Sequence, residues 1–332
     1  MWRYIVKRLL WLIVIMLCVA VVIFTILWFV PGDPAQIILG SGATNEDIER
    51  LREQLGLNEP YLVQLATFLS DTFLHLDFGE SYVYGVPVIQ EFATRLPRTL
   101  GLGLISMVLN IVIGIPLGVN AAIHRNTIWD QGVLVLAMVF ISVPQFYLGL
   151  LMVVLFSVQL GWLPPFGISG DYPTWTYWVM PVLANSLSGL AMNARQTRSA
   201  ALETIRADFV TTARAKGLPE NTVIYKHMLP NALIPVVNSL GMQLSTVVGG
   251  TVVIENVFSF PGIGQYLLTG VNSRDYPVIR GSVMILALFS AVITLLVDLV
   301  YAFLDPRIKA QYVNYAAKKS SPKEKKGGKK NG

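Results

Sequence analysis

Six apolar runs, each long enough to cross a lipid bilayer as a helix, constrain what this chain can fold into. About 20 helical residues span the roughly 30 Å of the hydrocarbon core. Of the 332 residues, 54% are hydrophobic and only 14% are charged, which is more apolar surface than one soluble core can bury. We therefore predict an all-α integral membrane protein with six transmembrane helices. The runs cover residues 9–30, 99–123, 131–160, 177–194, 232–254 and 281–304.

The positions of lysine and arginine predict the orientation, because the cytoplasmic flanks of membrane helices carry the basic excess. The arrangement that fits best places both termini in the cytoplasm, and Arg95 and Arg98, which then lie outside, fit it least well. The first segment, residues 1–30, lacks a small-residue cleavage site, so we expect a retained anchor. Much of the net charge of +5 lies in a lysine-rich cytoplasmic tail over 305–332, and we predict no nucleic-acid partner.

The segment over 31–95 is too long for a plain connection and carries its own helix signals. Thr44 with Asp47 three residues later is typical of a helix N-cap, and Gly56 follows an apolar stripe as a stop signal. A second helix is expected from Pro60. We predict an external subdomain that either caps the outer ends of the bundle or also docks an external partner.

A polar insert over 196–230 interrupts the five-helix core predicted for 96–304. Leu202, Ile205, Phe209 and Ala213 are spaced for one face of an amphipathic helix. Gly217 then allows a tight turn, as expected at a helix C-terminus.

The prolines after that turn predict a second short helix. Pro219 can begin this helix, which we expect to reach about Met228. Pro230 and Pro235 are expected to separate the insert from the fifth crossing. Periodicity alone leaves several alternatives open: partner binding, a helix on lipid headgroups, core packing between crossings, or only the positive-inside signal.

The spacing of this insert resembles a known signature. The permease subunits of binding-protein-dependent ABC importers share Glu-Ala-Ala, three residues, Gly, nine residues and Ile-x-Leu-Pro in the cytoplasm. That frame falls here on Thr211–Ala213, Gly217 and His227–Pro230, matching at the last Ala, the Gly and the Leu-Pro. The departures at Thr211, Thr212 and His227 are similar to the dipeptide, oligopeptide and nickel branch.

Further segments resemble the first permease of that branch, in the same order along nearly the whole chain. They are Pro31–Pro34, Asp77–Ser81, Ser142–Phe146, Leu160–Pro164, Glu255–Gly264 and Arg274–Pro277. The resemblance implies the type I ABC importer permease fold in a bacterial cell membrane.

By this resemblance, the helices around Gly217 form a coupling element that sits in a groove of a cytoplasmic ATPase. The resemblance also implies partners: a second homologous permease, two ATPase subunits or domains that bind ATP and Mg, and an external solute-binding protein. A peptide is the expected cargo, and nickel, glutathione and oligosaccharides are alternatives. The coupling residues are Ile205, Asp208, Phe209, Ala213, Arg214, Ala215, Lys216, Gly217, Leu218, Pro219, His227, Leu229 and Pro230.

Polar side chains in membrane crossings are costly, so they usually face a pathway or a helix partner. The candidates for pathway or gate are Gln145, Asn238, Gln243, Glu255, Asn256 and Asp298. We expect Glu255 near an external gate and Asp298 near a basic residue at the cytoplasmic end.

No catalytic chemistry is predicted for this chain. It has no Gly-x-x-x-x-Gly-Lys-Ser/Thr phosphate loop, and its three histidines and single cysteine suggest no metal site and no cofactor. An ion-coupled secondary transporter would need more membrane-embedded charges and perhaps inverted repeats. A membrane scaffold or enzyme would leave the Gly217 insert unexplained.

Overall fold

The computed structural model describes residues 2–40 and 42–304. Within these ranges the regular structure is helical, apart from one isolated bridge between Glu80 and Pro87. The predicted tail over 305–332 lies outside the described residues.

The first part of the chain forms α1 (Trp2–Phe29), α2 (Pro34–Leu39), α3 (Asn45–Gln54), α4 (Tyr61–Ser70), the π-helix η1 (Asp71–His75) and α5 (Val88–Ile123). The middle part forms α6 (Ile128–Ser142), α7 (Gln145–Met152), the π-helix η2 (Val153–Gln159), α8 (Thr176–Thr204), α9 (Asp208–Ala215), α10 (Glu220–Thr222) and the π-helix η3 (Val223–Met228). The last part forms α11 (Leu229–Ser245), α12 (Val247–Gly250), α13 (Val252–Val257), α14 (Ile263–Ser273) and α15 (Tyr276–Leu304).

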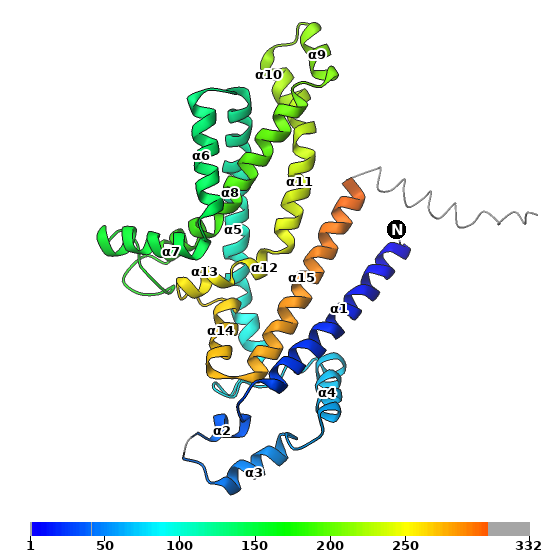
Figure 1. Cartoon of the computed structure of the whole chain (residues 1–332), viewed down its shortest axis with the longest axis vertical. Helices are drawn as coiled ribbons and strands as arrows, with labels where there is room; N and C mark the ends of the chain where they lie inside the picture. Colours follow the sequence, from blue (N-terminus) through cyan, green and yellow to red (C-terminus); the bar gives the residue numbers. More distant parts are fainter. Residues whose placement is uncertain (1, 41, 305–332) are drawn as a thin grey trace, which may run out of the picture.

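The long helices run in roughly the same direction and separate two polar ends (Figure 1). Helices α5, α6, α8 and α11 form a bundle, and α15 packs on α11 while α1 packs on α15. One end of the molecule carries α9 and α10, and the opposite end carries α2 and α3. The polar insert and the predicted external subdomain therefore lie at opposite ends of the bundle.

Several of the predicted crossings are helices with the length and apolarity of a membrane span. Among the described residues, Val6–Phe29, Val88–Ile123 and Tyr276–Leu299 have both properties, and a bent pair over Ile128–Gln159 could make a fourth. Helices α8 and α11 occupy the positions of the fourth and fifth apolar runs. The protein is thus an all-helical membrane protein with several spans, and the count of six stays a prediction.

The third apolar run is not one straight helix. Its two halves, α6 and α7 with η2, meet at an angle of 101°. Pro144 begins the second half, and Val143 before it is extended with φ −85° and ψ 127°. Proline disfavours the helical conformation of its preceding residue, so the helix breaks at this point.

The fifth apolar run is also divided, contrary to the prediction of one helix over 232–254. Helix α11 ends at Ser245, and two short helices, α12 and α13, follow it. Thr246 leaves the helical region with φ −102° and ψ 1°, and Gly249 and Gly250 lie just beyond. Threonine and glycine both have low helix propensity, which favours a change of direction here.

Helices α5 and α8 approach so closely that only small residues fit between them. A Cβ atom at Gly114 would lie 2.9 Å from the Leu190 carbonyl oxygen, and one at Gly118 would overlap the Ala194 carbonyl. Close approach through small residues is a common way for helices to associate in a membrane, where hydrophobic burial alone favours no contact. The α5–α8 contact is therefore the tightest joint in the bundle.

The segment between α1 and α5, for which an external subdomain over 31–95 is predicted, carries the short helices α2, α3, α4 and η1; residues 31–87 are here called the α2–α4 subdomain. Thr44 caps α3 by accepting the Asp47 N–H at 3.2 Å, and Gly56 follows α3 with φ +65°. Helix α4 begins directly after Pro60, as predicted. The subdomain is joined to the bundle by Asp275, whose carboxylate accepts the Ser81 hydroxyl at 2.6 Å.

Helix α5 begins at Val88, earlier than the expected 99, so Arg95 and Arg98 lie within it. Arg95 donates to Glu91 at 3.0 Å and stacks over the Tyr266 ring at 4.8 Å. Arg98 donates to the Pro261 carbonyl at 3.3 Å. Arg95 is thus paired with an acid and an aromatic ring, whereas Arg98 contacts a backbone carbonyl.

The close α5–α8 contact predicts a large difference between two glycine substitutions. Gly118→Val should destabilise the protein by about 1–3 kcal/mol, because overpacking forces the helices apart. Gly132→Val in α6 is the matched control, since a Cβ atom there meets nothing within 4 Å. Thermal unfolding of both variants in detergent measures the effect. Equal midpoints would contradict the close contact.

Candidate coupling site and polar network of the bundle

The polar insert begins where α8 ends. Helix α8 stops at Thr204, the link over 205–207 is not helical, and α9 starts after Ala207, which is extended with φ −70° and ψ 149°. The predicted stripe from Leu202 to Ala213 therefore spans two helices, and Phe209 is 46% exposed rather than buried. The prediction of a single amphipathic helix was wrong, because the non-helical link interrupts the helical spacing between Leu202 and Phe209. Val210, which periodicity missed, is the residue that α9 buries completely.

The turn at Gly217 has the predicted form. Gly217 has φ +77°, a conformation that residues with a side chain rarely adopt. Its N–H donates to the Arg214 carbonyl at 2.9 Å, and the Leu218 N–H donates to the Ala213 carbonyl at 3.5 Å. This is the pair of hydrogen bonds of a Schellman motif, so the turn direction depends on the glycine.

The second half of the insert runs without a break into the fifth long helix. After Pro219, α10 and η3 lead directly into α11 at Leu229, whose N–H donates to the Ile224 carbonyl five residues earlier. Pro230 lies in the first turn of α11 and Pro235 lies inside it. The prediction that these prolines separate the insert was wrong. Each proline removes one N–H from the helical hydrogen-bond pattern, but the helix continues through both of them, with the π-helical stretch η3 directly before Pro230.

The insert has a buried inner face and an exposed outer face. The inner face packs on α5 and α8 in one apolar cluster formed by Val119, Ala122, Ala201, Val210, Ala213, Val223, Ile224, Met228 and Ala232. Ile205 and Leu229 are partly buried against this cluster. Core packing, one of the alternatives from the sequence, therefore describes this inner face.

The outer face comprises the residues we name the coupling surface: Asp208, Phe209, Arg214, Ala215, Lys216, Gly217, Leu218 and Pro219, all of them exposed. Phe209 and Leu218 are the large apolar residues of this surface, and they are exposed by 46% and 37%. His227 is half-buried, and Pro230 is exposed at the start of α11. The outer face thus combines apolar contacts with polar and charged groups.

An ion pair closes the turn from one short helix to the other. Arg214 donates to both oxygens of Glu220, at 3.1 and 2.5 Å. Its guanidinium lowers the pKa of the Glu220 carboxyl, and Glu220 in turn raises the pKa of Arg214. Both side chains are well exposed, so water weakens the pair, and its effect is to orient the loop more than to stabilise it.

A second ion pair, which the sequence did not reveal, anchors α8 near the insert. Arg198 donates to both carboxylate oxygens of Asp130 at 2.5 and 2.7 Å, and the Asp130 side chain is only 2% exposed. Thr127 followed by Asp130 resembles an N-cap signal, and Thr127 does cap α6. That signal predicts the helix start but not the partner, which comes from 68 residues later.

The predicted pathway residues do not converge on one place. Gln243 donates to Asn193 at 2.8 Å, joining α11 to α8. Gln145 is half-buried at the start of α7, and Asn238 and Asn256 are exposed. Asp298 pairs with Arg8 of α1, as expected for a basic partner near that end. The polar residues of the bundle mostly join helices in pairs.

Glu255, predicted near an external gate, is completely buried. Its carboxylate accepts the Thr99 hydroxyl at 2.8 Å and the Thr251 hydroxyl at 2.9 Å. It also accepts the Gly264 N–H at 2.7 Å, at the start of α14. A carboxylate at a helix N-terminus is favoured by the free N–H groups and the helix dipole. Glu255 therefore joins α5, α13 and α14, and its role at a gate stays a prediction.

Comparison with known proteins decides the family. Residues 114–310 match the model of the binding-protein-dependent transport system inner membrane component, and residues 1–103 match that of its N-terminal region. The chain belongs to this family. It is the permease of an ABC importer of the peptide and glutathione branch, and in such importers partner ATPases hydrolyse the ATP.

Relatives match the permease over nearly their full length. It is 38% identical to the dipeptide transport system permease protein DppB of Alkalihalophilus pseudofirmus, over 93% of this chain and 100% of that protein. It is 41% identical to the glutathione transport system permease protein GsiC of Salmonella choleraesuis, over 93% of this chain and 99% of that protein.

A solved structure of the MetNI methionine ABC transporter in inward-facing form has a similar fold. Its TM-score is 0.55 at 21% identity, over 65% of this chain and 97% of that one. At this identity the likeness concerns the fold alone. It supports an importer permease fold for the helical bundle.

The positive φ of Gly217 predicts which substitutions the permease tolerates. Gly217→Val should abolish most coupled transport while the protein stays in the membrane, because a β-branched side chain disfavours the left-handed conformation. A Cβ atom there would meet nothing within 4 Å, so the cost is conformational and not steric.

Gly217→Asn is the matched control, since asparagine tolerates positive φ. Substrate uptake and membrane content of both variants should be measured together. Wild-type uptake by a well-expressed Gly217→Val permease would contradict the prediction.

The Asp130–Arg198 pair predicts a strong effect of removing one charge. Asp130→Asn should destabilise the permease by as much as a few kcal/mol, because it leaves Arg198 without its acidic partner. Breaking a fully buried ion pair costs about 3–5 kcal/mol, and this pair is partly exposed on the arginine side. Glu203→Gln, at an exposed acid of α8, is the control. Unfolding in detergent measures the loss, and a double variant with Arg198→Gln should recover part of it. No difference between Asp130→Asn and Glu203→Gln would refute the anchor.

Proposed function

We propose that the permease forms a translocation pathway with a second, similar permease and imports a peptide delivered by an external solute-binding protein. In each of the two permeases, the coupling surface contacts one cytoplasmic ATPase. The chain crosses the membrane six times with both termini in the cytoplasm of a bacterial cell. The α2–α4 subdomain lies outside, where a binding protein docks.

The observation that carries this proposal is the two-sided construction of the insert. Its inner face is packed on α5 and α8 through the cluster around Val210 and Met228. Its second half continues into α11 through η3 as one helical stretch with no intervening loop. A displacement of the outer face would therefore move α5, α8 and α11, as a coupling element requires.

Glutathione is the alternative cargo that a specific observation favours. The glutathione permease of Salmonella is 41% identical to this chain, and the dipeptide permease of Alkalihalophilus is 38% identical. These identities are too close to separate the two cargoes. Both are short peptides with a free carboxylate, so the same pathway suits either.

The proposal is tested in proteoliposomes that contain this permease, its second permease and their ATPases. Addition of a peptide-loaded binding protein should raise ATP hydrolysis several-fold and drive peptide uptake. The matched control is the same assembly with Gly217→Val, which should bind the membrane partners but respond weakly. A binding protein loaded with glutathione distinguishes the second cargo.

One outcome would overturn the proposal. Uptake by this chain alone, driven by a proton or sodium gradient without ATP, is the behaviour of a secondary transporter. Failure of the ATPase to copurify with the permease pair in mild detergent would contradict the role of the coupling surface.

A further inference from the structure

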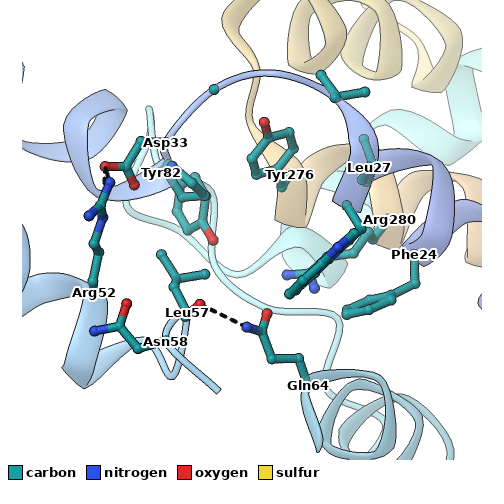
Figure 2. A pocket seen from close by; sticks show the side chains of 14 residues that line it. Phe24, Leu27, Asp33, Arg52, Leu57, Asn58, Gln64, Tyr82, Tyr276 and Arg280 are labelled. Atoms are coloured by element: carbon teal, nitrogen blue, oxygen red, sulfur yellow. Dashed lines mark hydrogen bonds and ion pairs between the residues drawn. The ribbon is translucent and has the colours of Figure 1, made fainter. Parts of the chain in front are cut away.

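A pocket of about 310 Å³ opens between the end of α1 and the α2–α4 subdomain, far from the coupling surface (Figure 2). Its apolar wall includes Phe24 and Leu27 of α1. Its polar wall includes Tyr276 and Arg280, both from the first turns of α15. This volume lies at the lower end of the range for small-molecule sites and suits a head group better than a whole peptide.

Arg280 places a positive charge in this pocket, and it has no ion-pair partner among the described residues. Its guanidinium lies over the Phe68 ring at 5.1 Å, and no described carboxylate lies within ion-pair distance of it. Asp71 acts on it only at longer range. Arginine is planar and always charged, and a partly buried one is favoured by a bidentate anion.

Tyr276 adds an unused hydrogen-bond donor to the same pocket. The side chain is only 8% exposed, and its hydroxyl has no hydrogen-bond partner among the described residues. Figure 2 shows Tyr82, Tyr276 and Arg280 around one hollow. A buried hydroxyl without a hydrogen-bond partner is destabilising, so a ligand that accepts its hydrogen bond would be favoured here.

The charge balance of the pocket favours an anion. Two arginines and one aspartate line it, so the lining is positive by one charge. The aspartate, Asp33, is engaged by Arg52 with nitrogen–oxygen distances of 2.8 and 3.0 Å. Arg280 is therefore the cation that remains available to a ligand.

The position of the pocket favours a lipid as the source of that anion. Both α1 and α15 have the length and apolarity of membrane spans, and the pocket lies where α1 ends and α15 begins. Trp28 packs edge-on against Tyr61 at 5.4 Å beside it. Aromatic rings of this kind gather at the membrane–water interface, at the depth of the lipid head groups.

We propose that this pocket binds the phosphate of an anionic phospholipid. Arg280 pairs with the phosphate oxygens, and the Tyr276 hydroxyl donates a hydrogen bond to the head group. The apolar residues Phe24 and Leu27 contact the first part of the acyl chains. A bound lipid of this kind would hold the α2–α4 subdomain against α1 and α15. Free phosphate offers the same chemistry, so the test must separate the two sources.

The test uses the complete importer complex, delipidated in detergent and titrated with phosphatidylglycerol or phosphatidylcholine under native mass spectrometry. Phosphatidylglycerol should bind the wild type about tenfold more tightly than it binds Arg280→Gln, as expected for loss of a charged hydrogen bond. Tyr276→Phe should weaken binding less and keep the fold, since it removes only the hydroxyl. Arg50→Gln is the control, because Arg50 is an exposed arginine of α3 that does not line the pocket.

Two results would overturn the proposal. Equal phosphatidylglycerol binding by wild type, Arg280→Gln and Tyr276→Phe would exclude the pocket as the site. Displacement of the lipid by millimolar inorganic phosphate, with no preference for phosphatidylglycerol over phosphatidylcholine, would show a free-anion site and not a lipid site. The readout is lipid binding, so it is independent of which substrate the importer carries.

Discussion

The close contact between α5 and α8 is the constraint on which the rest of the structure depends. Gly114 and Gly118 let the two backbones approach, and no larger residue would fit against Leu190 and Ala194. Helix α8 then leads directly to the insert, and α5 supplies Val119 and Ala122 to the cluster beneath it. In a bilayer, where apolar side chains are equally well solvated by lipid, such shape complementarity replaces hydrophobic burial as the source of helix association.

The insert is attached to the bundle in two different ways. A short non-helical link over 205–207 separates it from α8, whereas η3 runs into α11 with no intervening loop. Motion of the insert should therefore be passed most directly to α11, while the link at 205–207 allows an adjustment against α8. The Asp130–Arg198 pair holds α8 to α6 close to that link. A coupling element needs both a stiff connection and a place where the chain can bend.

Buried acids in this permease mainly join helices. Glu255 joins three helices, Asp130 joins two, and Asp275 joins the α2–α4 subdomain to the bundle. Each is surrounded by hydroxyls, N–H groups or an arginine, which offsets the cost of burying its charge. Arg280 differs, because no carboxylate of the described residues lies at ion-pair distance from its guanidinium.

The sequence by itself determined the features that depend on neighbouring residues. The apolar runs, the caps at Thr44 and Gly56, and the turn at Gly217 all follow from local chemistry and spacing, and the signature around Gly217 indicated the family. The burial of Val210 in place of Phe209 and the partner of Asp130 are visible only in the folded protein. Those features depend on contacts between residues far apart in the chain, and periodicity along one helix carries no information about which distant helix will cover its face.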